Sequence, residues 1–386
     1  MATAVLKAPP SPTSIRQSVP PSSGETLATL DLPAFAVTNP RAERQRLVQR
    51  CTGETIHVEN LMSLMPAWFK KIQPQKILDE VNVEIDEWLK TINLPEAKKR
   101  KQRETMSSSP AFSMRTARIF MFDDEIDPGG DLTSDDAGTR RICDQILQCI
   151  DACLHPDPQR ATATFGAPPP GSPGTVEMLH GILGTMRPGM GPATTERLRR
   201  QLHAYLEGVA RQHPVRRDDG LPDPWDHLRL RCDDIGVRPS VTQLEYAMGF
   251  ELPEHVVRHE AMECIVLDCA KLCVLVNEIL SLEKEFRAGQ LENLCLLFVH
   301  AEDISIHAAL AKVQALIRKH YRSCKAAVAR LPWTDDDEQT NEHVRRYVQC
   351  CRRIASGTAQ WSYVCTRYFG RAQLGEKWEM VATLGQ

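Results

Sequence analysis

Apolar residues recur every three or four positions through most of the chain after about residue 40. This period matches one face of an α-helix, whereas the alternating runs that mark β-strands are scarce. Aromatic residues make up only 6% of the 386 residues, and Leu, Ala, Glu, Arg and Gln, which favour helices, are plentiful. The periodic segments are 74–92, 113–126, 138–154, 174–186, 193–213, 241–250, 258–288, 291–298, 303–330 and 340–368. We therefore predict an all-α fold, formed by one domain over 41–386.

Stretches rich in Pro and Gly separate these segments and predict loops at 166–174, 186–192 and 220–224. Residues 1–40 are rich in Pro and Ser, and prolines break any amphipathic helix there. We therefore expect a disordered tail over 1–40. An organelle transit peptide is the alternative, because the first acid is Glu25.

The composition argues against a nucleic-acid partner and a membrane span, and it favours the cytoplasm as the compartment. A formal net charge of −3 gives no sign of a nucleic-acid partner, which would want a basic surface. No stretch approaches the roughly 20 apolar residues that span a bilayer, and the N-terminus lacks the apolar run of a secretory signal. The 13 cysteines form no CxxC pair. Cys149 with Cys153, and Cys269 with Cys273, could hold a soft metal, but small buried hydrophobes in a reducing cytoplasm are the simpler interpretation.

An acidic cluster follows an apolar run in FMFDDEID, residues 120–127. Burying charge is costly unless something pairs with it, so acids at the rim of an apolar region need an explanation. Asp123 and Asp127 are four residues apart and would share one face of a helix, with Asp124 beside them. Paired carboxylates suit Mg²⁺, which takes oxygen ligands and often bridges them to phosphate. A solvated acidic helix end is the alternative.

A second set of oxygen ligands occurs in VLVNEILSLEKEF, residues 274–286. Asn277, Ser281 and Glu285 are spaced i, i+4, i+8, which places an amide, a hydroxyl and a carboxylate on one helical stripe. This set again suits Mg²⁺, and Lys284 adds a cation beside it. Chance polar residues could also produce this spacing.

These segments together resemble the class I terpene synthases, specifically the fungal sesquiterpene cyclases, and 225–300 is most similar to presilphiperfolanol synthases. The family motif DDxxD is matched by Asp123, Asp124 and Asp127, and NDxxSxxKE by Asn277, Ser281, Lys284 and Glu285, with Glu278 in place of the usual Asp. The family's diphosphate sensor is matched by Arg231, 46 positions before Asn277, and its C-terminal Arg-Tyr pair by Arg367 and Tyr368. The resemblance covers roughly 60–370 and implies a single class I terpenoid synthase helical bundle around a central apolar cavity.

The resemblance also implies an activity: Mg²⁺-dependent ionisation of farnesyl diphosphate, cyclisation of the carbocation and release of diphosphate. Three Mg²⁺ ions would be bound with the diphosphate. Asp123, Asp124, Asp127, Asn277, Ser281 and Glu285 are the implied metal ligands, and Arg231, Lys284, Arg367 and Tyr368 the implied diphosphate ligands. Trp361, and either Phe120 or Phe122, could face the carbocation, since a cation–π contact contributes roughly 0.5–2 kcal/mol; plain core packing is the alternative for each.

The chain departs from the family at three positions near the sensor. Cys232 replaces an arginine, and Asp233 and Asp234 add negative charge. Two other activities stay open. A prenyl diphosphate synthase would share the fold but carry a second Asp-rich motif, and an inactive helical scaffold would bind a partner instead. A monomer and a homodimer are both compatible with the sequence.

Overall fold

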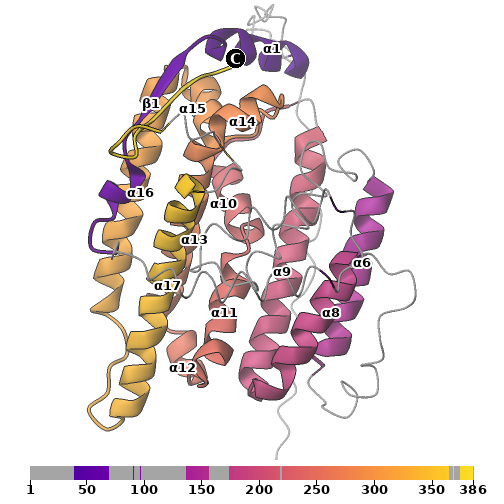
Figure 1. Ribbon diagram of the computed structural model, residues 1–386, viewed down its shortest axis with the longest axis vertical. Helices are drawn as coiled ribbons and strands as arrows, with labels where there is room; N and C mark the ends of the chain where they lie inside the picture. The colour runs from indigo at the N-terminus through magenta and orange to yellow at the C-terminus, as the bar shows by residue number, and fades with distance from the viewer. Residues whose placement is uncertain are drawn as a thin grey trace, which may run out of the picture. The chain divides into compact units, whose positions relative to one another are not determined.

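Helices fill most of the part of the chain that the computed structural model describes, residues 39–68, 90, 96, 136–155, 174–217, 220–364, 368 and 374–385 (Figure 1). All of these residues belong to one unit, Asn39–Gln386. The predicted helix over 113–126 lies outside the described residues, with Asp123, Asp124, Asp127 and Phe122, and so does the predicted helix over 74–92 apart from Lys90. Arg367 and residues 1–38 of the predicted tail lie outside them too.

The helices are α1 (Pro40–Cys51), α6 (Asp136–Cys153), α8 (Gly174–Met186), α9 (Pro192–Arg217), α10 (Pro224–Asp234), α11 (Val237–Met248), α12 (Glu254–Val257), α13 (Glu260–Leu280), α14 (Leu282–Arg287), α15 (Leu294–Glu302), α16 (Ile306–Val328) and α17 (Glu338–Val364). Two short 3₁₀ helices, η1 (Leu61–Leu64) and η2 (Arg187–Gly189), and two strands, β1 (Thr55–Val58) and β2 (Met380–Thr383), complete the set. The prediction of an all-α fold is confirmed.

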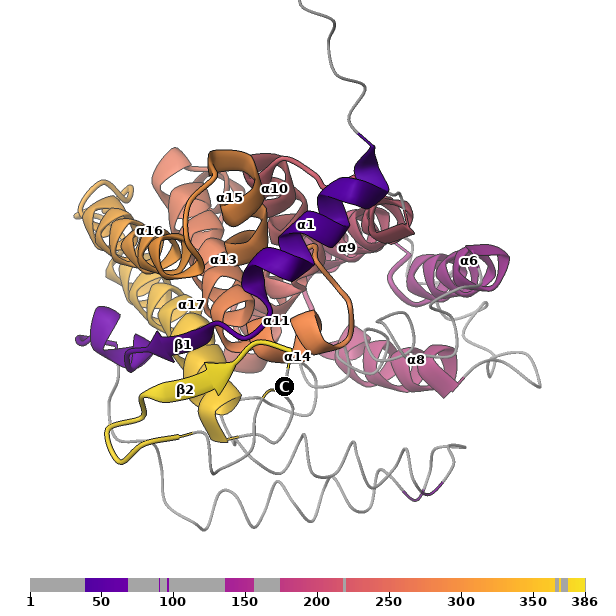
Figure 2. The same cartoon turned by 90° about the horizontal axis from the view of Figure 1, so that it is seen from above.

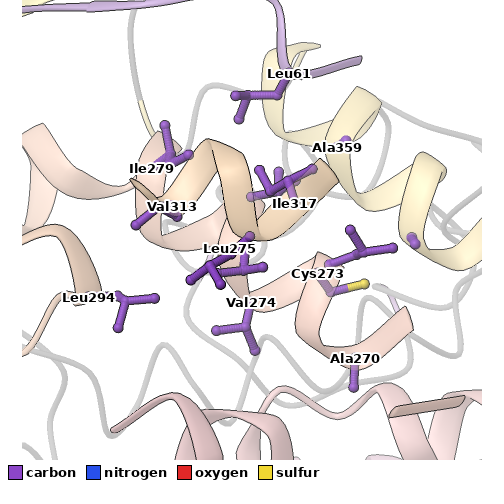
Figure 3. Close-up of a cluster of buried hydrophobic side chains, with 14 of the residues drawn as sticks. Leu61, Ala270, Cys273, Val274, Leu275, Ile279, Leu294, Val313, Ile317 and Ala359 are labelled. Carbon is purple, nitrogen blue, oxygen red and sulfur yellow. The ribbon is translucent and has the colours of Figure 1, made fainter. Parts of the chain in front are cut away.

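The helix α13 is the centre of the main core. It packs against α10, α11, α15, α16 and α17, which surround it in Figure 2. Its sequence is apolar on nearly every face, as expected for a helix buried all round. Figure 3 shows Leu275 and Ile279 of α13 beside Val313 and Ile317 of α16. Polar side chains at the C-terminal end of α13 therefore lie next to a closely packed apolar core.

A second cluster of buried side chains lies among α6, α8 and α9. The helix α9 joins this cluster to the main core through its contacts with α10 and α11. Gly208 allows the close approach of α9 to α10, because a Cβ there would lie 3.1 Å from the Asp233 Cβ and 3.2 Å from backbone atoms. A larger residue would push away the helix that carries Arg231.

The segment 258–288 is broken at Ser281, so our prediction of one continuous helix there is wrong. The Ser281 hydroxyl donates to the Asn277 carbonyl at 2.7 Å, a back-bond that bends helices. The Ser281 N–H still donates to the Asn277 carbonyl, and the Glu285 N–H to the Ser281 carbonyl. The i→i−4 bonding therefore continues across the bend and keeps the predicted stripe.

The helix α10 was not predicted, and the prediction of a loop over 220–224 is wrong at its last residue, Pro224. The Asp223 carboxylate caps α10 by accepting from the N–H groups of Trp225 and Asp226, and Pro224 occupies the first turn. His227 and Asp234 are polar and yet buried in α10. The sequence of α10 therefore lacks the helical spacing of apolar residues by which the other helices were predicted. The segment that we predicted to be a loop therefore leads directly into the helix that carries Arg231.

The strands β1 and β2 pair antiparallel, with Thr55 opposite Thr383 and Val58 opposite Met380 (Figure 2). Each strand has only four residues, so the alternation of exposed and buried residues in β1 is too short to stand out in the sequence. No single described helix is long and apolar enough to cross a membrane; α15 and α16 pass that test only as a pair bent by 120°. The described cysteines are free, and all but Cys264 and Cys350 are buried, as the interpretation as small hydrophobes predicts.

Candidate metal and diphosphate site

The predicted triad lies where α13 meets α14. Asn277 is in the last turn of α13, Ser281 is at the bend, and Glu285 is in the first turn of α14. Ser281 is buried, whereas Asn277 and Glu285 are half-buried. Because the bonding continues through the bend, the amide, hydroxyl and carboxylate lie on successive turns.

Arg231 lies beside this triad and joins α10 to α13. Its Nη2 donates to Asn277 Oδ1 at 3.0 Å, its Nε to Glu278 Oε1 at 3.1 Å and its Nη1 to Asp234 Oδ1 at 2.7 Å. Burial alone would lower the pKa of Arg231, but the charges of Asp234, Glu278 and Glu285 outweigh it and hold the pKa above its usual value. The predicted register of Arg231 with Asn277 is therefore a direct hydrogen bond, and the side chain is a fixed cation.

Glu278, which stands where the family has Asp, anchors Arg231 from behind. It is 2% exposed, and its Oε2 accepts from the Leu294 N–H at 2.5 Å and lies 3.4 Å from His227 Nε2. Burial would raise the pKa of Glu278, but His227, Arg231 and the Leu294 N–H lower it to about 2. This carboxylate is therefore an anion that ties α10, α13 and α15 together.

The other acids of the sensor segment have partners as well. Asp234 accepts from Arg231, and the partly exposed Asp233 pairs with Arg211 of α9 at 3.0 Å. Burial raises the pKa of the Cys232 thiol to about 12, so this side chain is a neutral packing group. The departures Cys232, Asp233 and Asp234 thus leave Arg231 positively charged and oriented toward Asn277.

Tyr368 and Trp361 approach the same end of α13 from the C-terminal part of the chain. The Asn277 Nδ2 donates to the Tyr368 hydroxyl at 3.0 Å, and the ring of Trp361 meets that of Tyr368 edge-on at 5.9 Å. Trp361 is 1% exposed and belongs to the main core. The described part of α17 extends to Val364, within the predicted helix over 340–368, and Tyr368 contacts Asn277 from beyond that part.

Glu285 has a partner that the sequence did not reveal. The Asn293 Nδ2 donates to Glu285 Oε2 at 2.9 Å. Burial and the charge of Glu278 raise the pKa of Glu285, and the hydrogen bond from Asn293 and the charge of Arg231 oppose that rise. The only available signal for Asn293 is its place just before the apolar run LCLLFV, which is typical of a helix N-cap.

The oxygen donors at the end of α13 fit a hard cation. Asn277, Ser281 and Glu285 offer oxygen atoms only, and each of these oxygens can accept more than one interaction. Within the described ranges, no three His, Cys, Asp or Glu side chains gather as a cage for a metal. A metal held here would rely on one carboxylate and two neutral oxygens, and so would need further oxygens from a substrate.

An all-α bundle whose central helix ends in such oxygens beside a fixed arginine defines the class as a class I terpene synthase. A family model described as "Terpene synthase family 2, C-terminal metal binding" matches residues 116–323. The chain is 50% identical over 366 residues to terpene cyclase braA from Annulohypoxylon truncatum, covering 90% of this chain and 95% of that protein. The chain therefore belongs to this terpene synthase family, and the resemblance to fungal class I terpene synthases is confirmed.

Other similar proteins agree with this assignment. Silphinene synthase peniA from Penicillium patulum is 27% identical over 257 residues, which is 65% of each protein. The solved structure of linalool/nerolidol synthase from Streptomyces clavuligerus superposes with a TM-score of 0.61 at 20% identity, covering 74% of this chain and 95% of that one. A single-residue variant of cucumene synthase gives 0.59 at 19% identity, covering 78% and 100%. At such identities the structures show the shared fold alone.

Proposed function

We propose that this terpene synthase is a sesquiterpene synthase that ionises farnesyl diphosphate with Mg²⁺, cyclises the carbocation and releases diphosphate. One observation carries the proposal. The Arg231 guanidinium is held by Glu278 and Asp234 and directed at Asn277, at the point where the oxygen triad lies. A permanent cation thus lies beside oxygen atoms of the kind that hard cations prefer, which supports a diphosphate neutralised by metal and arginine together.

The residues that would hold Mg²⁺ come from two motifs. Asn277, Ser281 and Glu285 would hold it at the end of α13, and Asp123, supported by Asp124 or Asp127, would hold it at the acidic motif; we propose three ions in all. When bound, Mg²⁺ supplies Lewis-acid activation of the diphosphate as a leaving group. The all-oxygen triad and the adjacent cation support this choice of metal.

Arg231 would bind the diphosphate without leaving its anchors. A guanidinium carries five N–H donors, and Asn277, Glu278 and Asp234 take one each. The remaining two N–H groups could donate charge-assisted hydrogen bonds to phosphate oxygens. Lys284, Arg367 and Tyr368 are the further diphosphate ligands that we propose, by similarity to the family.

Trp361 is the aromatic residue that we propose at the hydrocarbon end of the substrate, with Phe122 from the acidic motif. The Trp361 ring is held by its edge contact with Tyr368, so its face has a fixed direction. A carbocation against that face would gain roughly 0.5–2 kcal/mol, and more when water is excluded. We propose that the hydrocarbon chain of the substrate occupies the predicted central apolar cavity. The free cysteines support the cytoplasm as the compartment.

The test is incubation with Mg²⁺ and geranyl, farnesyl or geranylgeranyl diphosphate, followed by gas chromatography of a pentane extract. We expect a cyclic C15 product from farnesyl diphosphate and none without Mg²⁺. In a parallel incubation that also contains isopentenyl diphosphate as the five-carbon donor, a longer prenyl diphosphate, detected after dephosphorylation, would identify a prenyl diphosphate synthase. A product from geranylgeranyl diphosphate and from neither shorter substrate would reassign the substrate. Turnover of no substrate, together with no binding of Mg²⁺ and diphosphate, would indicate an inactive scaffold.

A further inference from the structure

Asn293 lies at the start of α15 and is fully buried, at 0% exposure. Its Oδ1 accepts from the Cys295 N–H at 3.0 Å and so caps the helix. Its Nδ2 donates to the carboxylate Oε2 of Glu285 at 2.9 Å and to the carbonyl of Glu278 at 2.8 Å. One carboxamide therefore serves a helix end, a backbone carbonyl and a proposed metal ligand.

The helix cap alone does not require asparagine at this position. Asp, Ser and Thr cap helices about as well, because each supplies an oxygen acceptor. Only an amide supplies an acceptor and two N–H donors on the same short side chain. Glu285 and the Glu278 carbonyl accept hydrogen bonds from these N–H donors. An amide at position 293 is therefore required by the candidate site, whereas the cap of α15 requires only an oxygen.

The position of Glu285 in the fold explains why such a partner matters for its side chain. It lies in the first turn of a helix of only six residues, directly after the bend at Ser281, and it is half-buried. A free glutamate side chain loses up to about 2 kcal/mol of rotamer entropy when it is held in one conformation. A carboxylate that is already held when the metal arrives avoids much of that loss at binding.

The segment that carries Asn293 is itself held from outside. The neighbouring Glu292 side chain is buried, and its carboxylate pairs with Arg44 of α1 at 2.6 Å. Arg44 also donates to the Gly220 carbonyl at 3.4 Å. The turn between α14 and α15 is therefore fixed on one side by α1 and on the other by Glu278.

We propose that Asn293 is a positioning residue for the metal site, which holds the Glu285 carboxylate in the orientation that binds Mg²⁺. This role rests on the proposed function of Glu285 as a metal ligand. Partners of this kind, one bond away from the metal, typically change metal affinity 10- to 100-fold when they are replaced.

Two substitutions separate the cap from the donor. Asn293→Asp keeps the shape and the cap oxygen but removes both N–H donors and places a like charge beside Glu285. Asn293→Ser keeps a cap oxygen with no added charge. Ser305→Ala is the matched control, because Ser305 caps α16 through the Ala308 N–H and its cap hydrogen bond is exposed.

The measurement is titration of Mg²⁺ into protein saturated with inorganic diphosphate, followed by calorimetry or by thermal shift. We expect both Asn293 variants to weaken apparent Mg²⁺ affinity about tenfold or more, with the larger loss for Asp. Turnover should recover to within a few-fold at saturating Mg²⁺, since the ligand itself remains. Ser305→Ala should change thermal stability only.

Wild-type Mg²⁺ affinity in Asn293→Ser would overturn the positioning role, because the donor would then be dispensable. If that variant fails to fold, wild-type affinity in Asn293→Asp would overturn the role in the same way. A Glu285→Gln variant that binds Mg²⁺ and diphosphate normally would overturn the proposed function of Glu285 instead, and this role of Asn293 with it.

Discussion

The Asn277 side chain donates through Nδ2 to the hydroxyl of Tyr368 at 3.0 Å, while its Oδ1 accepts from Arg231 at the same distance. The two contacts distinguish the ends of the amide, so its oxygen is directed toward α10. Segments that are 91 residues apart in the chain thus set the direction of one proposed metal ligand.

Tyr368→Phe should therefore reduce turnover about tenfold, a loss of about 1.4 kcal/mol in transition-state binding. The loss of stability should be smaller than for a fully buried donor, because the Asn277 side chain that loses its acceptor is only half-buried. Tyr363→Phe is the control. The Tyr363 hydroxyl accepts from the Leu61 N–H at 2.9 Å, away from Asn277, so its loss should cost about 1–3 kcal/mol of stability and leave turnover near normal. Steady-state kinetics and thermal melting of both variants are the measurements. Near-normal turnover in Tyr368→Phe together with reduced turnover in Tyr363→Phe would contradict this role for Tyr368.

Arg231→Lys should lower turnover about a hundredfold or more, even though the positive charge is kept. A single ammonium cannot reproduce the planar fork that bonds Asn277, Glu278 and Asp234 at once. Arg238→Ala is the matched control, because Arg238 pairs with the exposed Glu263 at 3.4 Å. Such exposed pairs contribute only about 0–1 kcal/mol. Equal losses of kcat in the two variants would mean that Arg231 acts through stability alone.

Arg44→Met should destabilise the protein by about 3 kcal/mol, because it leaves the buried Glu292 carboxylate without its partner. The double variant Arg44→Met with Glu292→Met should recover much of that loss, since apolar replacements of a buried pair are often tolerated. Urea unfolding of the single and double variants measures both values. A double variant less stable than either single one would show that the contact is not a simple buried ion pair.

Asp268 gives a prediction of pH dependence outside the site. It is buried between α13 and α16, with His320 Nδ1 2.7 Å from its Oδ1. Burial would raise the pKa of Asp268, but the hydrogen bonds from His320 and Ser323 lower it below its ordinary value. The folded protein then releases this proton more readily than the unfolded chain. The stability that Asp268 contributes is therefore present above about pH 4 and is lost as pH falls through the folded pKa.

Asp268→Asn should accordingly be less stable than the unaltered protein at pH 7, by about 1–3 kcal/mol. The difference should begin to shrink below about pH 4, because the unfolded chain then takes up the proton at Asp268, and should shrink further as pH falls through the lower folded pKa. Urea unfolding at about pH 7 and about pH 3.5 tests this, with the exposed Asp335→Asn as control. A difference that stays constant with pH would show that the charge of Asp268 is not what stabilises the contact.

The sequence predicted the helical class and the triad because both depend on local spacing. Asn277, Ser281 and Glu285 needed only the period of a helix, and the back-bond of Ser281 bends that helix without breaking the stripe. The relation between Arg231 and Asn277 came from resemblance, since α10 itself was hidden by its buried polar residues. Whether Asp123, Asp124 and Asp127 approach the triad is a prediction that the described residues do not include.

The supporting residues could not be found from spacing. Glu278 looked like a departure from a motif, and only the approach of α10 and α15 shows that Arg231 and the Leu294 N–H meet on it. No pattern in the sequence connects Asn293 with Glu285, and their hydrogen bond is found only in the folded structure. Such contacts depend on how helices pack, which a periodic pattern does not specify.

The pairing of β1 with β2 implies an order of events in folding. Thr55 and Thr383 are 328 positions apart, so closing this loop in an unfolded chain would cost about 5 kcal/mol of chain entropy. A ladder of four residues on each side cannot offset that loss alone. The helices have to assemble first and bring the two strands near each other, and the ladder then closes at little further cost. The same ladder can open without unfolding α13, so its amide hydrogens should exchange with solvent before those of the central helix.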